Sequence, residues 1–186
     1  MEFLRIKIVA MVKIKVTVTA SVNRLGATTN KVLTEVGDKV GLEEVVVTST
    51  LRTPFAQAEA MLSNIEQNRL IRYKWAGEEV NKLARQMRGQ KVERMKIIEA
   101  MVAKIKELAK LGAEGRVSKH CVAEEEYDKC NIIDVSYLSM AEDKREDFLK
   151  AMIARKEVAK VIQPISRQLQ GYDAGEPAMH FEINQA

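Results

Sequence analysis

The strongest constraint on the fold is the change of hydrophobic period along the chain. Polar and apolar residues alternate with a period of two in "IKIVAMVKIKVTVTAS" near the N-terminus and in "PAMHFEIN" near the C-terminus, which is typical of β-strands. Between Gly77 and Leu111, apolar residues recur at helical spacing instead. This stretch forms either a helical hairpin that Gly89 divides or one long helix. The combination predicts an α+β fold.

Capping residues mark the ends of further elements. A helix is expected in "NRLGATTNKVLTEVGDKVG", with Thr28 or Thr29 as its cap and Gly41 just past its end. "LEEVVVTST" is typical of a strand, and "RTPFAQAEAMLSNIEQN" of a helix that Thr53 caps. A last helix is expected in "AEDKREDFLKAMIARKEVAKVIQPISRQL", ended or kinked near Pro164.

The length of the chain indicates one domain. A chain of 186 residues can bury one core but is short for two large domains. We therefore expect residues 1–186 to form a single domain, with residues 66–115 as a helical insertion within it.

The net charge of +4 is distributed unevenly. Residues 66–120 hold 14 basic and 7 acidic side chains, whereas residues 121–186 hold 8 basic and 13 acidic ones. A basic surface attracts phosphate or anionic polymers, but a solvated helix face is the commoner origin of this pattern. Aromatic residues make up 5% of the chain and no nucleic-acid-binding motif is present, so binding of nucleic acid is not expected.

The N-terminal region does not resemble a secretion signal. Lys13 and Lys15 interrupt the apolar region that such a signal needs. The chain also has no uninterrupted apolar stretch long enough to span a bilayer. We therefore expect no signal peptide, no membrane span and a protein that is cytoplasmic when made.

Two histidines and one aspartate are the best candidates for a metal site. His120 follows the turn-like segment "EGRVSK", and His180 lies in the terminal strand pattern, on the face opposite Phe181. Asp134 interrupts the apolar run "NIIDVSY", where a carboxylate is costly unless it is paired or bound to a metal. Two imidazoles, one carboxylate and a water form an open tetrahedral zinc site, so Zn²⁺ is the expected cofactor.

Four segments resemble, in the same order, the motif blocks of a known enzyme family. "VVVTSTLRTPFAQAEAM", "SKH", "NIIDVSY" and "GEPAMHFEIN" are similar to those of the D-alanyl-D-alanine carboxypeptidase and L-alanyl-D-glutamate endopeptidase zinc metallopeptidases. The resemblance implies a Hedgehog/DD-peptidase fold, with an antiparallel sheet flanked by helices. It also implies metal ligands and substrate-binding residues: His120, Asp134 and His180 for zinc, and Arg52, Gln57 and Ser118 for substrate.

The implied function is hydrolysis of stem-peptide bonds in peptidoglycan by a bacterial or bacteriophage protein, acting at the cell wall or carried in a virion. Arg52 would stabilise the oxyanion or anchor a substrate carboxylate. Pro177 occupies the usual position of the family's catalytic acid. The resemblance therefore implies Glu176 as the catalytic acid, with Asp173 as the second candidate. Thirteen residues separate His120 from Asp134 where the family has a short turn, which predicts a longer loop there.

The sequence leaves two alternatives open. The displaced acid and the helical insertion favour a non-catalytic metal-binding protein, or a phage structural or interaction protein, on the same fold. A closed structural zinc site would instead combine the two histidines with Cys121 and Cys130, although the usual CxxC spacing is missing. The two cysteines are otherwise expected to be reduced thiols.

Overall fold

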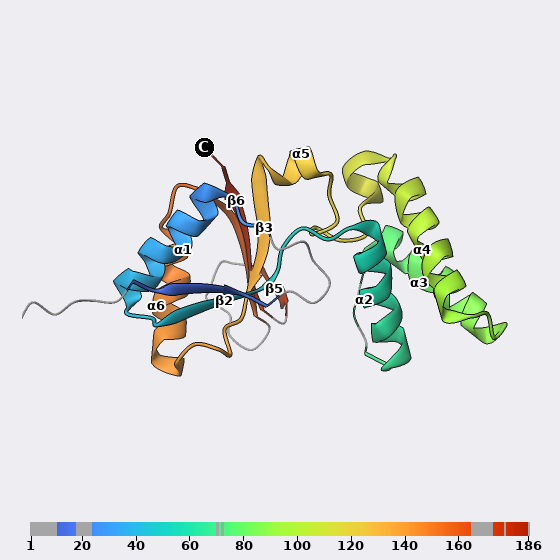
Figure 1. Ribbon diagram of the computed structural model, residues 1–186, viewed down its shortest axis with the longest axis horizontal. Coiled ribbons are helices and arrows are strands. Elements are labelled where there is room, and N and C mark those ends of the chain that lie inside the picture. The colour runs from blue at the N-terminus through green and yellow to red at the C-terminus, as the bar shows by residue number, and fades with distance from the viewer. Residues whose placement is uncertain are drawn as a thin grey trace, which may run out of the picture.

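The structure is a computed structural model of the chain. It describes residues 11–17, 24–69, 71, 73–164, 173–176 and 178–185, with residues 164 and 173–176 described by their backbone alone. Within these residues, a mixed sheet carries helices on one face, and a bundle of three helices lies beside the sheet (Figure 1). The chain therefore has the α+β fold that the sequence predicted.

Six strands form one sheet in the described part of the chain, in the order β1-β2-β3-β6-β4-β5. The three inner pairings are antiparallel, whereas β1 pairs with β2, and β4 with β5, in parallel. The strands are β1 (Lys13–Val16), β2 (Glu44–Ser49), β3 (Cys130–Val135), β4 (Val158–Pro164), β5 (Asp173–Glu176) and β6 (Met179–Asn184).

The expectation of an antiparallel sheet is therefore wrong at both edges. Helix α1 (Ala27–Val40) follows β1 in the chain and precedes β2. A helical crossover of this kind returns the chain in the same direction, so the two strands it joins run parallel. The predicted N-terminal strand is confirmed at β1, and the rest of its pattern lies mostly outside the described residues.

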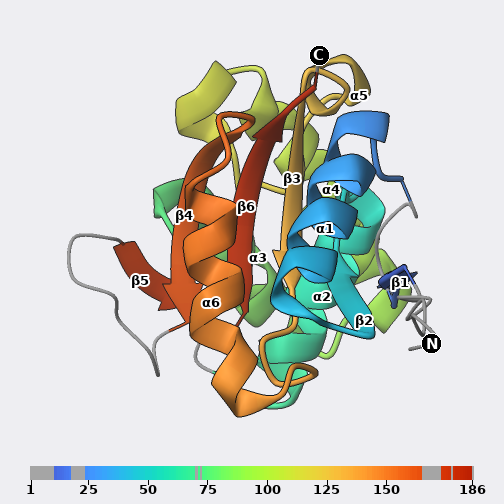
Figure 2. The same cartoon turned by 90° about the vertical axis from the view of Figure 1, so that its left-hand side faces the viewer.

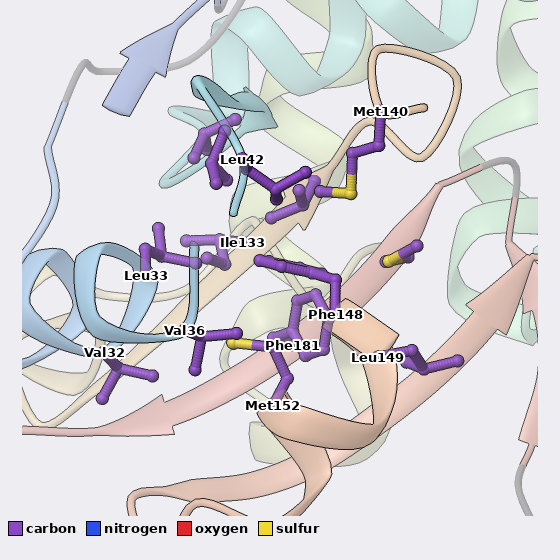
Figure 3. Close-up of a cluster of buried hydrophobic side chains, with 14 of the residues drawn as sticks. Val32, Leu33, Val36, Leu42, Ile133, Met140, Phe148, Leu149, Met152 and Phe181 are labelled. Carbon is purple, nitrogen blue, oxygen red and sulfur yellow. The ribbon is translucent and has the colours of Figure 1, made fainter. Parts of the chain in front are cut away.

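The main core lies between the sheet and two helices. Helices α1 and α6 (Glu142–Ile153) lie side by side over one face of the sheet (Figure 2). Their apolar side chains meet those of β2, β3 and β6 (Figure 3). Phe148 of α6 packs edge-on against Phe181 of β6, with ring centroids 6.3 Å apart. This layer fixes the strands whose opposite face carries the site described below.

A second apolar cluster holds the helical bundle together. Helices α2 (Pro54–Glu66), α3 (Trp75–Gly89) and α4 (Arg94–Ala109) pack on one another. Gly89 ends α3, so the central stretch forms two helices rather than one. The interpretation of residues 66–115 as an insertion stays a prediction. No helix in the described ranges combines the length and apolarity needed to cross a membrane.

Two of the three predicted helix caps are confirmed, Gly41 and Thr53. Gly41 follows α1 with a left-handed φ of 75°, and the Thr53 hydroxyl accepts a hydrogen bond from the Ala56 N–H at 3.2 Å. The N-cap of α1 is Gly26 rather than Thr28 or Thr29. The Gly26 N–H donates to the Asn131 side chain at 2.6 Å, a long-range contact that no local pattern indicates.

Two segments differ from the sequence-based prediction. The predicted helix over residues 141–169 ends at Ile153, and β4 begins at Val158. The β-branched residues after this break pair with β6, so sheet pairing outweighs the helical spacing there. The loop predicted between His120 and Asp134 contains the short helix α5 (Glu124–Tyr127).

Candidate metal centre

The sheet register brings polar residues from three strands into one row. Asp134 of β3 and His180 of β6 are direct partners, and Ser49 at the end of β2 pairs with Asp134. Their neighbours Ile133 and Phe181 are buried in the main core. Side chains alternate across a strand, so Asp134 and His180 lie on the opposite face, as the alternation in the terminal strand predicted.

His120 reaches this row from a loop between the 3₁₀ helix η1 (Gly112–Gly115) and α5. Its carbonyl oxygen accepts the Arg52 N–H at 2.8 Å, and its own N–H donates to the Ser118 hydroxyl at 3.3 Å. In Figure 1 the segment that leaves β2 and the segment that leads to α5 run together between the sheet and the bundle. The His120 side chain is thereby held at the end of β2, where it is buried.

The three predicted metal ligands meet around one carboxylate. Asp134 Oδ2 lies 3.1 Å from His120 Nε2, and Asp134 Oδ1 lies 2.9 Å from His180 Nδ1. The two imidazole rings stand at 87° to each other, with centroids 5.3 Å apart. Each residue offers one ligand atom within 4.8 Å of the others. The group can therefore hold a metal ion.

The tautomer of His120 favours a cation at this place. Its Nδ1 lies 3.1 Å from the Thr50 carbonyl oxygen, which can only accept a hydrogen bond, so Nδ1 carries the proton. In the neutral ring, Nε2 then presents a lone pair to the Asp134 carboxylate. Two lone pairs 3.1 Å apart repel each other unless a proton or a cation lies between them. The backbone carbonyl of Thr50, just after β2, thus prepares His120 as a metal ligand through Nε2.

The spacing of the donors also suits a small ion. Zinc–nitrogen and zinc–oxygen bonds of about 2.0–2.1 Å place tetrahedral ligands about 3.3 Å apart. The imidazole–carboxylate separations of 3.1 Å, to Asp134 Oδ2, and 2.9 Å, to Asp134 Oδ1, are near this value, and one ligand atom from each residue lies within 4.8 Å of the others. Two imidazoles and one carboxylate leave a fourth position free, as in catalytic zinc sites, although the same donors also suit iron.

Buried polar atoms without partners gather near this centre. In the described part of the chain, four buried side-chain nitrogen or oxygen atoms have no hydrogen-bond partner, although such groups are normally satisfied. Three of them belong to residues at the centre or joined to it: Ser49 Oγ, Arg52 Nε and His180 Nε2. Unsatisfied groups concentrated at one place favour a site that a ligand completes.

The predicted substrate-binding residues lie on the segments that hold His120. Arg52 Nη1 donates to Gln57 Oε1 at 3.5 Å, and the Gln57 side chain is buried at the start of α2. Gln57 thus orients the guanidinium group. Ser118 is half-buried, and its hydroxyl accepts the His120 N–H. Binding of a substrate by these three residues stays a prediction.

The backbone register indicates where the two candidate acids, Asp173 and Glu176, lie. Asp173 of β5 pairs with Ile162 of β4, which in turn pairs with His180. Strands lie about 4.8 Å apart, so the Asp173 backbone is about 10 Å from that of His180. After an irregularity in the register, Glu176 pairs with Pro164. Pro177 lies outside the described residues, and the role of Glu176 stays a prediction.

The structure does not bring the two cysteines and the two histidines together in the alternative closed zinc site. The metal-capable group among the described residues contains neither Cys121 nor Cys130. Cys130 pairs with Asn184 at the other end of β3 from Asp134. Burial raises the pKa of the Cys121 thiol to about 11, so this side chain is protonated at neutral pH. Both thiols are free, as the sequence predicted.

Two charged residues beside the centre, Glu182 and Lys119, are not among the predicted site residues. Glu182 Oε1 lies 3.7 Å from His180 Nε2 and 3.2 Å from Lys119 Nζ. The neighbouring His180 imidazole, and then Lys119, lower the pKa of Glu182 to about 2 although burial opposes this. The period-two pattern already placed Glu182 on the face of His180, but no sequence signal indicated Lys119.

The charges at the centre stabilise one another. Burial opposes ionisation of Asp134, but the neighbouring His120 and His180 imidazoles outweigh it and hold the pKa of Asp134 well below its usual range. Burial likewise disfavours a charge on His180, but the carboxylates of Asp134 and Glu182 outweigh it and raise the pKa of His180. An ionised Asp134 next to a protonated His180 is therefore the stable metal-free state at mildly acidic pH.

These shifts predict how the stability of the metal-free protein depends on pH. The depressed pKa of Asp134 stabilises the fold above its unfolded value of about 4, and this contribution is lost as pH falls below that value. The raised pKa of His180 stabilises the fold below about pH 6.5, and this contribution is lost as pH rises through the folded value. The combined contribution is greatest between about pH 4 and pH 6.5.

Urea unfolding with a chelator present, at about pH 3, 5.5 and 8, would measure this contribution as the difference in unfolding free energy between wild type and Asp134→Asn. The difference is expected to be largest at the middle pH. A difference independent of pH would show that the charges of Asp134 and His180 are not coupled in the folded protein.

Comparison of the chain with known protein families, with curated proteins and with solved structures finds no match.

Proposed function

We propose that this chain is a zinc-dependent peptidase that hydrolyses stem-peptide bonds of peptidoglycan. The observation that carries the proposal is the convergence of His120, Asp134 and His180 on one point from a loop and two strands. The order of the four motif segments supports the substrate class. A zinc ion at this place would supply Lewis-acid chemistry, which activates water near neutral pH and polarises a carbonyl group.

The other residues have distinct roles in this proposal. Arg52 stabilises the negative charge that develops on the scissile carbonyl oxygen, or anchors a substrate carboxylate, because a guanidinium group suits both tasks. Gln57 holds the guanidinium in place. Glu176 accepts a proton from the attacking water and returns it to the leaving amine, as general acid–base catalysis requires.

One observation favours a second candidate function. Pro177 occupies the usual position of the catalytic acid in the peptidase family, and proline has no group that exchanges a proton. On this basis the chain would be a metal-binding structural or interaction protein, for example of a virion, that keeps zinc without catalysis. Both candidate functions predict bound zinc, but only the peptidase predicts turnover of a substrate.

Metal content and turnover together test the proposal. We expect about one zinc per chain by elemental analysis, and loss of turbidity when the zinc-loaded protein is added to purified cell walls. Glu176→Gln is expected to lower kcat by about 10²–10⁴-fold, the usual contribution of a general acid–base, with the zinc content unchanged.

Asp173→Asn is the matched control, because it removes the other carboxylate of β5 and is expected to leave kcat within a few-fold. A larger loss with Asp173→Asn than with Glu176→Gln would transfer the acid–base role to Asp173. Stoichiometric zinc with no cleavage of any cell wall would favour the structural candidate instead.

A further inference from the structure

One ring nitrogen of His180, Nε2, would contact neither Asp134 nor a metal ion bound at the centre. Nδ1 faces Asp134 at 2.9 Å, so it is the nitrogen placed to bind a metal ion together with Asp134. Nε2 is buried and has no hydrogen-bond partner. When Nδ1 gives its lone pair to a metal, the proton of the neutral ring lies on Nε2. A buried N–H of this kind requires an acceptor.

Glu182 is placed to be that acceptor. It stands two residues after His180 on β6 and therefore on the same face of the strand. Its Oε1 lies 3.7 Å from His180 Nε2, and a shift of about 0.8 Å brings the pair to an ordinary hydrogen-bond length. The Glu182 side chain is only 25% exposed, so water competes weakly for its carboxylate.

The other ligand histidine already shows the same arrangement. His120 directs Nε2 towards Asp134, and its Nδ1 contacts the Thr50 carbonyl oxygen at 3.1 Å. Each imidazole therefore has an oxygen beside the nitrogen that is turned away from Asp134. Such outer partners fix the tautomer and orientation of a metal-bound histidine and increase its basicity.

We propose that Glu182 is a positioning residue of the metal centre, which accepts a hydrogen bond from His180 Nε2–H and keeps Nδ1 free to bind the metal. The proposal rests on the metal binding in the proposed function. The ion pair between Glu182 and Lys119, at 3.2 Å, is the competing explanation for the position of this carboxylate. An experiment must therefore separate the two partners of Glu182.

Zinc affinity, measured by competition with a chromophoric chelator, tests the proposal. Glu182→Gln keeps the size of the side chain but removes its charge, and it is expected to weaken zinc binding by about 10–100-fold, as loss of an outer partner usually does. Glu182→Asp keeps the carboxylate and is expected to restore part of the affinity. Circular dichroism of each metal-free variant reports whether the fold is retained.

Lys119→Met is the matched control, since it breaks the same ion pair and leaves the carboxylate in place. We expect its zinc affinity to stay at or above that of the wild type, because it also removes a positive charge next to a cation site. A loss in Lys119→Met as large as that in Glu182→Gln would assign the effect to the ion pair and overturn the proposal.

Spectroscopy gives a readout that a purely structural role would not change. In the zinc-loaded wild type, ¹⁵N chemical shifts of the His180 ring are expected to show a protonated Nε2. The visible absorption of the cobalt-substituted protein is expected to change in Glu182→Gln and not in Lys119→Met. Unchanged affinity and unchanged spectra in Glu182→Gln would overturn the role of Glu182 while metal binding stands. Absence of zinc binding in the wild type would overturn both.

Discussion

Replacement of His180 by alanine is expected to abolish metal binding and, with it, any hydrolysis of cell walls. The His180 side chain supplies one of three ligand atoms and is almost fully buried, at 1% exposure. Its removal leaves Asp134 with a single imidazole partner. Loss of a direct ligand exceeds the roughly 10–100-fold effect of an outer partner, so zinc affinity is expected to fall by more than about 100-fold.

Chelator competition and elemental analysis measure this loss, and the chain offers matched controls. His120→Ala is expected to behave in the same way, because its Nε2 is the ligand atom on the other side of Asp134. Cys121→Ser and Cys130→Ser are expected to bind zinc like the wild type. Retention of stoichiometric zinc in His180→Ala, or its loss in either serine variant, would contradict the assignment of the ligands.

Phe181→Ala is expected to destabilise the fold by about 3–5 kcal/mol, the usual cost of removing a buried phenylalanine. The Phe181 side chain is fully buried in the main core and packs edge-on against Phe148 of α6. The substitution removes this contact and leaves a cavity between β6 and the helices. Because Phe181 faces away from the centre, the ligand side chains are retained.

Urea unfolding of the metal-free protein checks this value. Phe55→Ala is the matched control: the same substitution at a residue that is 43% exposed on α2 is expected to change stability by less than about 0.5 kcal/mol. Equal effects of the two substitutions would show that β6 is not packed against α6 as described. The folded fraction of Phe181→Ala is expected to bind zinc with the affinity of the wild type.

Segments with a strong local pattern were predicted correctly. The apolar spacing in α1, the Thr53 cap and the alternation in β6 each reflect interactions within a few residues. The segment from 154 to 164 was predicted incorrectly, because its charged and β-branched residues fit both periods. Pairing with β6 makes the segment a strand, and a pattern within the segment itself does not reveal a partner that lies elsewhere in the chain.

The residues of the candidate site were likewise predicted only in part. Asp134 was identified because a lone carboxylate in an apolar strand needs a partner, and the chain contains only two histidines. The Thr50 carbonyl and Lys119 were not identified, because a single backbone acceptor or a single lysine has no distinguishing sequence pattern. Ser118 was expected to bind substrate, and the structure adds that its hydroxyl accepts the backbone N–H of His120.

The sequence by itself determined which side chains of each strand share a face, since alternation is a property of a single strand. It also determined which residue types can bind a metal. Only the tertiary structure decided that Asp134 and His180, 46 residues apart, are partners across two strands, and that the Thr50 carbonyl fixes the tautomer of His120. Strand order, register and loop closure depend on contacts between distant segments, and these contacts form only when the whole core packs.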